Sequence, residues 1–430
     1  MLKFARRFRS LLAIVAALLL VSGLAVPYAS ALPSSQSGDP IELTFWNYWD
    51  GTNGEVMQSL VDEWNAANPD IQVENVFIGF NDLLPKLQAA TAGGDAPDIA
   101  AGDLIWMPKL AQSGAIAPLD ELAATAGIDL TDFYPALLSA GSYDGKTYGL
   151  PVSTNNLELF YNKELFEKAG LDPNKPPTTW DELREMAKQC ANPDEGIAGM
   201  ELFTEPGEGL TWQYQVYLWQ SGGEFLTDDL SAAAFNSDAG KQSLQFWTDL
   251  LNVDQSAPLT TWGQFGQGTS CMAMDGSWMV GIWAADPPFD LGTAVMPIPT
   301  GGQQATNMGG EQLVIFSKDA ERQAAAAKFM AWLTSTETQV SWDQQTGFTP
   351  IRESVATSTE YLDWVNTSQP LLLPFVEQQV NAHNRPAVTN YPEISDAFSR
   401  ELERALLGEA TVDEALAAAE KAVNDLLAGR

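Results

Sequence analysis

Residues 41–78 read IELTFWNYWDGTNGEVMQSLVDEWNAANPDIQVENVFI, and this stretch decides the fold. Its two ends, Ile41–Phe45 and Ile71–Ile78, are short apolar runs typical of strands. Between them, four apolar side chains recur at helical spacing and would share one face of an amphipathic helix: Val56, Leu60, Val61 and Trp64. A strand, a helix and a second strand in this order predict the repeating unit of an α/β fold.

The same cycle repeats immediately downstream. Apolar residues between Leu83 and Ala90 predict a second helix that Gly93 and Gly94 end, and the pattern DIAA at Asp98–Ala101 predicts a short buried strand. Alternating strands and helices build a mostly parallel sheet with helices on both faces. We therefore predict the α/β class with such a sheet.

Two capping boxes mark helices farther along the chain. Glu182 follows Thr179 by three residues, and Glu414 follows Thr411 in the same way. In this motif the threonine oxygen accepts a hydrogen bond from a free backbone amide, while the glutamate reaches back to the cap. A helix is therefore expected to start at each threonine.

The length of the chain predicts two domains, because about 400 mature residues exceed what one hydrophobic core usually serves. The sequence contains two cysteines, Cys190 and Cys271. A disulfide between them and two separate buried thiols both fit, since the sequence does not give the Cα separation that a bridge requires.

The N-terminus has the pattern of a secretory signal peptide. Four basic side chains lie in MLKFARRFRS, and the apolar run LLAIVAALLLV follows. Small residues at 29–31 predict cleavage after Ala31, and no cysteine lies there to receive a lipid, so a lipobox lipoprotein is not expected. We expect a flexible leader at 32–39 and a mature chain secreted to the periplasm or the extracellular cell surface.

The composition is strongly acidic. The chain has 22 basic and 56 acidic side chains, and loss of the four basic residues of the signal peptide would take its formal charge from −34 to near −38. Such a surface repels nucleic acid and anionic lipid, so no nucleic-acid partner is expected. The acidity otherwise indicates a solvated exterior and says little about a ligand.

Motifs of metal and nucleotide chemistry are absent from the sequence. It has one histidine, His383, and neither an HExxH nor a CxxC motif, so no metal site and no cofactor are predicted. It also lacks the G-x-S-x-G elbow and the phosphate-binding P-loop. A glycosidase needs only two carboxylates, so this one enzyme class stays open.

Aromatic residues in polar surroundings are the positive signal. Seven tryptophans lie near glycine, asparagine or aspartate: Trp46, Trp49, Trp106, Trp212, Trp262, Trp278 and Trp283. A sugar ring has an apolar C–H face and polar edges, so its sites combine a flat indole with carboxylate, amide or guanidinium groups. Core packing is the alternative for any one of these tryptophans.

In their order, several segments of the chain resemble the extracellular solute-binding proteins, family 1, which serve carbohydrate ABC importers. The matching blocks cover nearly the whole mature chain: LTFWNYWDG, EWNAANPDIQV, GGDAPDIAAGD, YDGKTYGLP, LFYNKELFEKAGLDPNKPPTTWDEL, CMAMDGSWM, GGEQLVIFS and TGFTPIRES, with the closing helix pair. The resemblance implies a carrier that is not an enzyme and that delivers a sugar or short oligosaccharide to permease subunits in the membrane. A monomer is expected.

The resemblance also implies the architecture. It is a two-lobed α/β fold of the periplasmic-binding-protein type, with a ligand cleft between the lobes and several hinge crossings. Crossings are expected near Pro151, near Met296 and at 332–341. Lobe 1 would contain residues 40–150 and 296–335, and lobe 2 residues 151–295 and 336–430.

Matches to family site regions place ten residues in the cleft: Trp46, Asp50, Phe80, Asp103, Asn155, Trp212, Trp278, Gly310, Glu311 and Arg385. Trp278, in DGSW, corresponds to a stacking tryptophan of sugar-binding members. Phe80 departs from the pattern, because many relatives have a tyrosine there whose hydroxyl contact would be lost. For Asp103, Glu311 and Arg385 the alternative is a solvated or lobe-linking salt bridge.

Two other functions stay open at this point. A glycerol-3-phosphate or glycerophosphodiester-binding member of the same family would share most of these blocks. A secreted glycosidase is the alternative from another class. The sequence favours the sugar carrier, because no cluster of lysine or arginine residues is found near the expected mouth loops beyond Arg385, although backbone amides at helix N-termini can also hold a phosphate.

Overall fold

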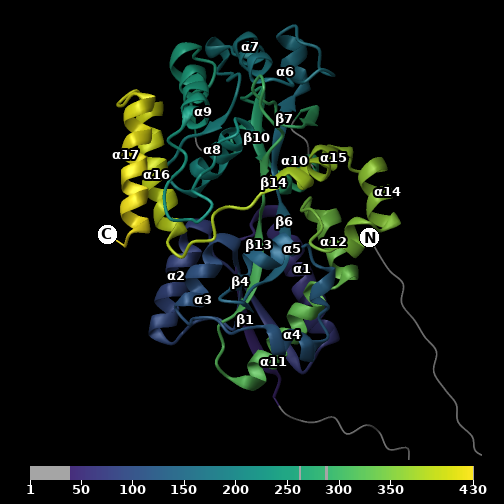
Figure 1. Cartoon of the computed structure of the whole chain (residues 1–430). Coiled ribbons are helices and arrows are strands. Elements are labelled where there is room, and N and C mark those ends of the chain that lie inside the picture. The colour runs from purple at the N-terminus through teal and green to yellow at the C-terminus, as the bar shows by residue number, and fades with distance from the viewer. Residues whose placement is uncertain (1–38, 261–262, 286–288, 430) are drawn as a thin grey trace, which may run out of the picture. The chain divides into compact units, whose positions relative to one another are not determined.

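The computed structural model describes residues 39–260, 263–285 and 289–429 (Figure 1). The predicted signal peptide, its cleavage after Ala31 and the leader up to residue 38 lie outside the described residues, as does Trp262. Within the described part of the chain, no helix combines the length and the apolar character needed to cross a bilayer.

A five-stranded sheet contains the stretch at 41–78 together with later segments. Its strands lie in the order β2 (Ile71–Phe77), β1 (Ile41–Asn47), β3 (Ile99–Asp103), β13 (Gly309–Ile315) and β6 (Leu150–Asn155). β1 pairs in parallel with β2 and β3, whereas β13 pairs antiparallel with β3 and β6. The expected mostly parallel sheet is therefore mixed, because β13 arrives from a distant part of the chain and runs in the opposite direction.

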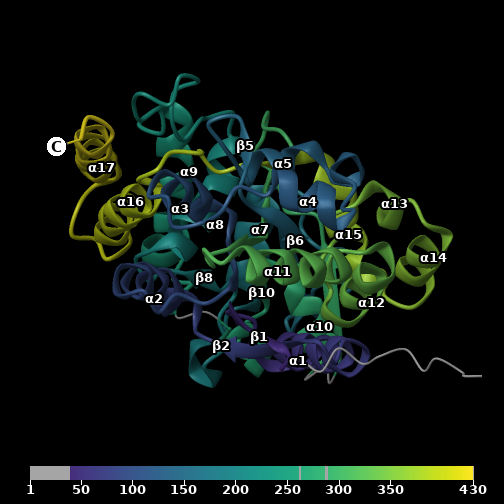
Figure 2. The same cartoon turned by 90° about the horizontal axis from the view of Figure 1, so that it is seen from below.

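Helices cover both faces of this sheet, as predicted. Successive strand residues point to opposite faces, so Ala100 belongs to one core while Ile99 and Ala101 belong to the other. The Ala100 core includes side chains of α2 (Phe80–Gly93) and α3 (Met107–Gln112). The other core includes side chains of α1 (Gly51–Ala67), α5 (Pro135–Ala140), α11 (Ala320–Leu333) and α12 (Thr336–Thr346), and α4 (Asp120–Ala126) packs on α11. Figure 2 shows α2 and α3 apart from α1 and α11.

The helix predicted between the first two strands is α1. It buries Leu60, Val61 and Trp64 as expected, and it also buries Met57, whereas Val56 is half-buried. The shift of one position means that the buried stripe includes Met57 in place of the predicted Val56. The strand–helix–strand unit itself is confirmed.

A second, three-stranded sheet is antiparallel throughout. Its order is β10 (Met272–Gly276), β7 (Leu157–Asn162) and β11 (Leu291–Ala294). Figure 1 shows β7 and β10 among five helices: α6 (Lys163–Lys168), α7 (Trp180–Cys190), α8 (Glu208–Gln220), α9 (Asp238–Thr248) and α10 (Trp278–Ala285). Every residue of α8 from Leu210 onward is buried, so this helix is a core element and not a surface helix.

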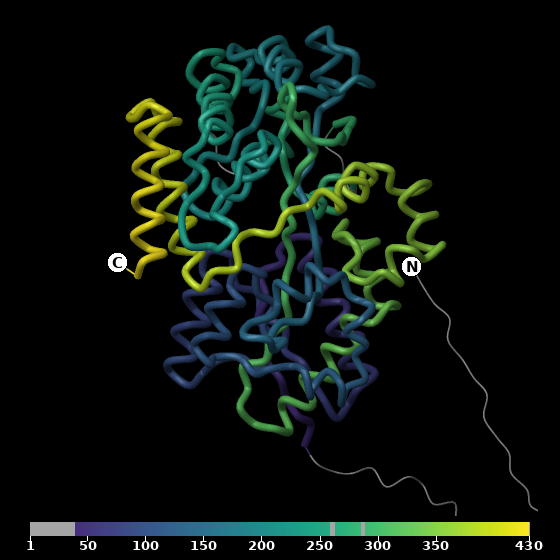
Figure 3. Tube along the Cα trace, viewed as in Figure 1, coloured from purple at the N-terminus to yellow at the C-terminus, as the bar shows by residue number. Residues whose placement is uncertain are grey.

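The chain passes between the two sheets in short segments. β6 ends at Asn155 and β7 begins at Leu157, so the first crossing is the single residue Asn156. The return runs through β12 (Thr306–Asn307) into β13, and β14 (Ala382–His383) pairs in parallel with β12. Figure 3 shows the chain around β14 crossing the molecule between α15 (Leu373–Gln378) and α16 (Tyr391–Leu406). The lobe boundaries and hinge positions given above stay predictions.

Local signals in the later chain are confirmed. α7 and α17 (Val412–Leu427) both begin with complete capping boxes, at Thr179 with Glu182 and at Thr411 with Glu414. A disulfide joins Cys190 at the end of α7 to Cys271 just before β10, with a Cα separation of 6.4 Å. The structure thus selects the bridge over two separate thiols. The remaining elements are short: β4 (Ser142–Tyr143), β5 (Lys146–Thr147), β8 (Leu202–Phe203), β9 (Leu259–Thr260), α13 (Glu353–Ala356) and α14 (Thr359–Thr367).

Candidate functional site

A cavity of about 510 Å³ lies between strand ends of the five-stranded sheet and the starts of α8 and α10. Its walls come from the ends of β1, β3 and β6, the starts of α2, α8 and α10, the first residues of β13 and the segment after β14. Nine of the ten predicted residues line it: Asp50, Phe80, Asp103, Asn155, Trp212, Trp278, Gly310, Glu311 and Arg385. Whether each of them contacts a ligand stays a prediction.

Trp46 is the predicted residue that does not line this cavity. Its half-buried ring lies beside the ammonium of Lys86, whose Nζ is 5.1 Å from the ring centroid. Tyr48, two residues later in the same segment, lines the cavity instead. In an extended chain these two side chains point to the same face, and Tyr48 lies about 6 to 7 Å farther along the chain, just past the last residue of β1. The polar aromatic segment therefore reaches the cavity through Tyr48, Trp49 and Asp50.

Aromatic rings form one wall. Trp212 on α8 stacks on Trp278 at the start of α10, with ring centroids 5.6 Å apart and planes at 15°. Trp278 also stacks on Phe348 at 6.5 Å, and Phe348 on Trp342 at 5.5 Å. The wall therefore consists of rings from α8, α10 and the segment after α12, and Trp342 on α12 supports Phe348 from outside the cavity lining. Flat rings in a cavity wall offer their faces to the apolar side of a ligand.

Charged side chains form another part of the cavity wall. Arg385 donates from Nη2 to Asp103 Oδ1 at 2.8 Å and from Nη1 to Glu208 Oε1 at 2.8 Å. The side chain of Arg385 is only 2% exposed. Asp103 is fixed locally, because its Oδ1 also accepts from the backbone amide of Ile105 at 3.0 Å. These three residues, which we call the ionic triad, come from β3, α8 and the segment after β14.

Burial and the neighbouring charges shift the pKa values of Glu208 and Arg385 in opposite directions. Burial raises the pKa of Glu208, and the guanidinium of Arg385 offsets part of that rise. Burial alone would lower the pKa of Arg385, but Asp103 and Glu208 outweigh it, so that its pKa is raised and it stays charged. A buried cation with two carboxylate partners is the arrangement that makes burial of charge tolerable.

Glu311 lies close to the triad and is held separately. Its Oε1 accepts from the Tyr48 hydroxyl at 2.8 Å, and its Oε2 accepts from the hydroxyl of Ser153. Burial raises the pKa of Glu311 to about 8, and nearby Asp103 adds to the rise. The pKa of Tyr48 is raised as well, first by burial and then by Glu311. At neutral pH this carboxyl is therefore largely neutral, unlike a solvated glutamate.

The start of β13 allows a close approach of backbone and side chains. A Cβ at Gly309 would overlap Oδ1 of Asn155, and Gly310 has a φ of 143° that L side chains rarely adopt. Two nearby polar atoms, Oδ1 of Asn155 and Nε1 of Trp212, are buried and have no hydrogen-bond partner among the described residues. One is an acceptor and the other a donor, so both can bind a hydroxyl-bearing ligand.

Sequence reasoning missed several residues of this cavity. Glu208 is the most important, and the signal that could have found it is the glycine-rich stretch TEPGEG, in which Gly207 has a φ of 125° and precedes α8. Tyr48 lies inside the quoted segment WNYWDG but was not selected. Phe348 gave no local signal, because its position depends on the packing of α12 against α1 and α10.

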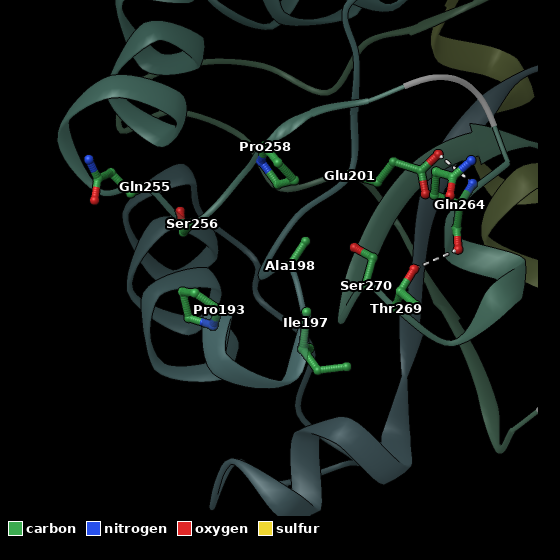
Figure 4. A pocket seen from close by; sticks show the side chains of 11 residues that line it. Pro193, Ile197, Ala198, Glu201, Gln255, Ser256, Pro258, Gln264, Thr269 and Ser270 are labelled. Carbon is green, nitrogen blue, oxygen red and sulfur yellow. Dashed lines mark hydrogen bonds between the residues drawn. The ribbon is translucent and has the colours of Figure 1, made fainter.

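A second cavity, of about 370 Å³, is lined by residues between 193 and 201 and between 255 and 270 (Figure 4). Its described lining has no aromatic side chain, and its one carboxylate is Glu201. Glu201 already accepts from the backbone amides of Gly263, Gln264 and Phe265. The carboxylate therefore holds the protein's own loop, and this cavity lacks the combination of rings and uncommitted polar atoms found in the larger one.

The fold and the larger cavity define a solute-binding protein of the two-lobed α/β type. Residues 48–340 match the model of the family described as bacterial extracellular solute-binding protein. The chain belongs to this family, which confirms the family membership inferred from the sequence motifs. Members of this family are binding proteins, found outside the cytoplasm.

Three relatives show the range of the similarity. The chain is 47% identical to a cyclic alpha-maltosyl-1,6-maltose binding protein from Arthrobacter globiformis, with 91% of this chain and 100% of the other covered and a TM-score of 0.78. It is 31% identical to an ABC transporter solute-binding protein from Thermotoga lettingae bound with alpha-D-tagatose, with 90% and 100% covered and a TM-score of 0.81. It is 26% identical to the sn-glycerol-3-phosphate-binding periplasmic protein UgpB of Pectobacterium atrosepticum, over 93% and 94% of the two chains.

Proposed function

We propose that this chain is the substrate-binding component of an ABC importer and that its larger cavity holds a neutral carbohydrate. The main observation that supports this proposal is that the stacked rings of Trp212 and Trp278 lie in the same cavity wall as two unpaired polar atoms, Oδ1 of Asn155 and Nε1 of Trp212. Rings match the C–H face of a sugar, and a buried donor and acceptor match its hydroxyls. The binding of a cyclic maltosyl-maltose by the 47% identical relative supports an oligosaccharide of glucose as the first ligand to test.

The mechanism requires no chemical change in the ligand. A sugar that contacts elements of both sheets favours the conformation in which they are closed around it. The closed form would then dock on permease subunits in the membrane. We propose a monomer that reaches the periplasm or the cell surface after cleavage near Ala31, and no catalysis of its own.

The experiment is a calorimetric and thermal-shift screen of the mature chain. The panel is cyclic maltosyl-maltose, maltose, maltotetraose, tagatose, glycerol 3-phosphate and glycerophosphocholine. A ligand that binds the folded state stabilises it by about 2.7 kcal/mol at one hundred times its Kd. We expect stabilisation by at least one sugar, and stabilisation by the phosphate compounds alone would contradict the proposal.

A second candidate, a glycerol-3-phosphate carrier, is favoured by the similarity to UgpB. The same screen separates it from the sugar carrier. A glycosidase is tested in the same samples, because the ligand is recovered after binding and analysed by mass. Recovery of intact oligosaccharide supports a carrier, and shortened products would support an enzyme.

A further inference from the structure

The charges around the larger cavity are unequal. Arg385 is the only basic residue in its described lining, and five lining residues are acidic: Asp50, Asp103, Glu205, Glu208 and Glu311, of which Glu311 is largely neutral at neutral pH. Both terminal nitrogens of the Arg385 guanidinium already donate to carboxylates, Nη2 to Asp103 and Nη1 to Glu208 at 2.8 Å and more weakly to Asp103 Oδ2 at 3.4 Å, whereas the buried Nε has no described partner. The one cation that could attract an anionic ligand is therefore neutralised by the protein itself.

An anionic ligand would meet two obstacles in this cavity. It would have to displace a carboxylate of the protein that is paired with the guanidinium at 2.8 Å and is nearly as buried. It would also lie close to several like charges, and such juxtaposition costs several kcal/mol at an interface. A neutral hydroxyl group meets neither obstacle.

The two carboxylates are not equivalent in what they do for the fold. Asp103 also accepts from the Ile105 amide and so shapes the turn that follows β3. Glu208 is the first residue of α8, a helix of 13 residues whose N-terminus favours negative charge. Removing the charge of Glu208 would leave both Arg385 and this helix terminus available to another anion.

We propose that Glu208 is a specificity-determining residue that closes the Arg385 site to phosphate-bearing ligands. Glu208 acts by neutralising the charge of Arg385 from the Nη1 side of its guanidinium, so that the cavity accepts neutral sugars and rejects their phosphate esters. This inference rests on the proposed carbohydrate function and adds a rule for which compounds of that class the cavity admits. Arg385 in this view is a masked anion site.

The test compares Glu208→Gln with a matched control, Glu205→Gln. Glutamine keeps the size of the side chain and an acceptor for Nη1 while it removes the charge. Glu205 lines the same cavity, but the described partners of Arg385 are Asp103 and Glu208, so this control removes one like charge from the lining without removing a partner of the guanidinium. Maltose, maltose 1-phosphate and glycerol 3-phosphate are titrated by calorimetry at one fixed ionic strength, because salt screens charge effects.

We expect Glu208→Gln to raise the affinity for each phosphate ester, relative to maltose, at least about tenfold over the unmodified chain. The control should change that ratio less than about threefold. A melting scan of each variant establishes that it is folded, and Asp103→Asn, which removes the other negative charge beside Arg385, serves as a second variant with the same expected direction.

Three outcomes overturn the inference. They are phosphate esters that bind the unmodified chain as tightly as maltose does, no gain in the folded variants, or an equal gain in the control. If the unmodified chain binds no sugar, the proposed function fails, yet the comparison of Glu208→Gln with the unmodified chain on glycerol 3-phosphate still decides the inference. The two failures are therefore distinguishable.

Discussion

The two walls of the larger cavity differ in the kind of contacts that hold their side chains. The ionic triad, with Glu311 and Tyr48 beside it, is held by ion pairs and hydrogen bonds to other protein groups, although Nε of the buried Arg385 has no described partner. The aromatic wall makes ring contacts but leaves Nε1 of Trp212 without a described partner. Both walls contain residues that the sequence motifs assigned to ligand binding.

This difference suggests which wall contributes to ligand affinity and which contributes to the stability of the fold. A group that is already paired gains little by contacting a ligand, because it must first give up its partner. A ring face or an unpaired donor gains the full contact. We infer that the aromatic wall provides affinity, while the charged wall holds the segments together and sets the charge that a ligand is allowed to carry.

Removal of the arginine should have the largest effect, and it should fall on stability. Arg385→Met leaves Asp103 and Glu208 buried without their cation, which costs about 3–5 kcal/mol of the free energy of unfolding at neutral pH. Urea unfolding measures the loss. The control is Arg400→Met, because Arg400 is exposed and pairs with Asp396 on the same helix at 3.0 Å. Equal stability of the two variants would mean that the triad is not structural.

Truncation of the central ring should act on affinity. Trp278→Ala removes the ring that stacks on both Trp212 and Phe348, and we expect the affinity for the bound sugar to fall at least about tenfold. Calorimetry measures the affinity, and circular dichroism checks that the fold is intact. Trp364→Ala, on α14 and outside the cavity lining, is the matched control. Unchanged affinity in Trp278→Ala would refute the division between the two walls.

Glu311 predicts a pH dependence of stability. Its folded-state pKa of about 8 lies above the value of an unfolded glutamate, so its contribution is fully present below the unfolded pKa and is lost as pH rises through about 8. Glu311→Gln should remove a loss on the order of 1 kcal/mol per pH unit between about pH 5 and 8.

Unfolding curves of the variant and the unmodified chain across this range measure the difference. The subtraction matters, because burial also raises the pKa of Glu158, Glu201 and Asp343. Glu121→Gln, at an exposed position of α4, should leave the pH profile as it is. An unchanged profile in Glu311→Gln would show that this carboxyl titrates normally.

The smallest effect is expected at Trp46. Its ring lies beside Lys86 and outside the cavity lining, so Trp46→Ala should change the sugar affinity less than about twofold. Calorimetry under the conditions used for Trp278→Ala gives the comparison. A tenfold loss would mean that the ligand extends beyond the described cavity and that the motif-based assignment of Trp46 is right.

Much of the fold could be predicted from the sequence because its signals are local. The spacing of Leu60, Val61 and Trp64 predicted α1, and the capping boxes at Thr179 and Thr411 predicted the starts of two helices. The direction of β13 could not be predicted this way. The direction depends on which distant strands β13 pairs with, and the residues of a strand do not indicate its pairing partners.

Most residues of the candidate site could be predicted from the sequence, but the contacts between them could not. Motifs pointed to Asp103 and Arg385, which are 282 positions apart, yet nothing local shows that Glu208 completes the pair. The choice between Trp46 and Tyr48 depended on where β1 ends. The raised pKa of Glu311 and the joining of Cys190 to Cys271 likewise arise only when distant segments pack together.

The one-residue crossing at Asn156 limits how the molecule can move. The strand before it is tied into a ladder with β13, and the strand after it into ladders with β10 and β11. Neither side can stretch or slide without breaking those ladders, so at this joint relative motion reduces to torsion about a few backbone bonds. At Asn156 the two sheets can therefore rotate relative to each other, but they cannot separate or slide.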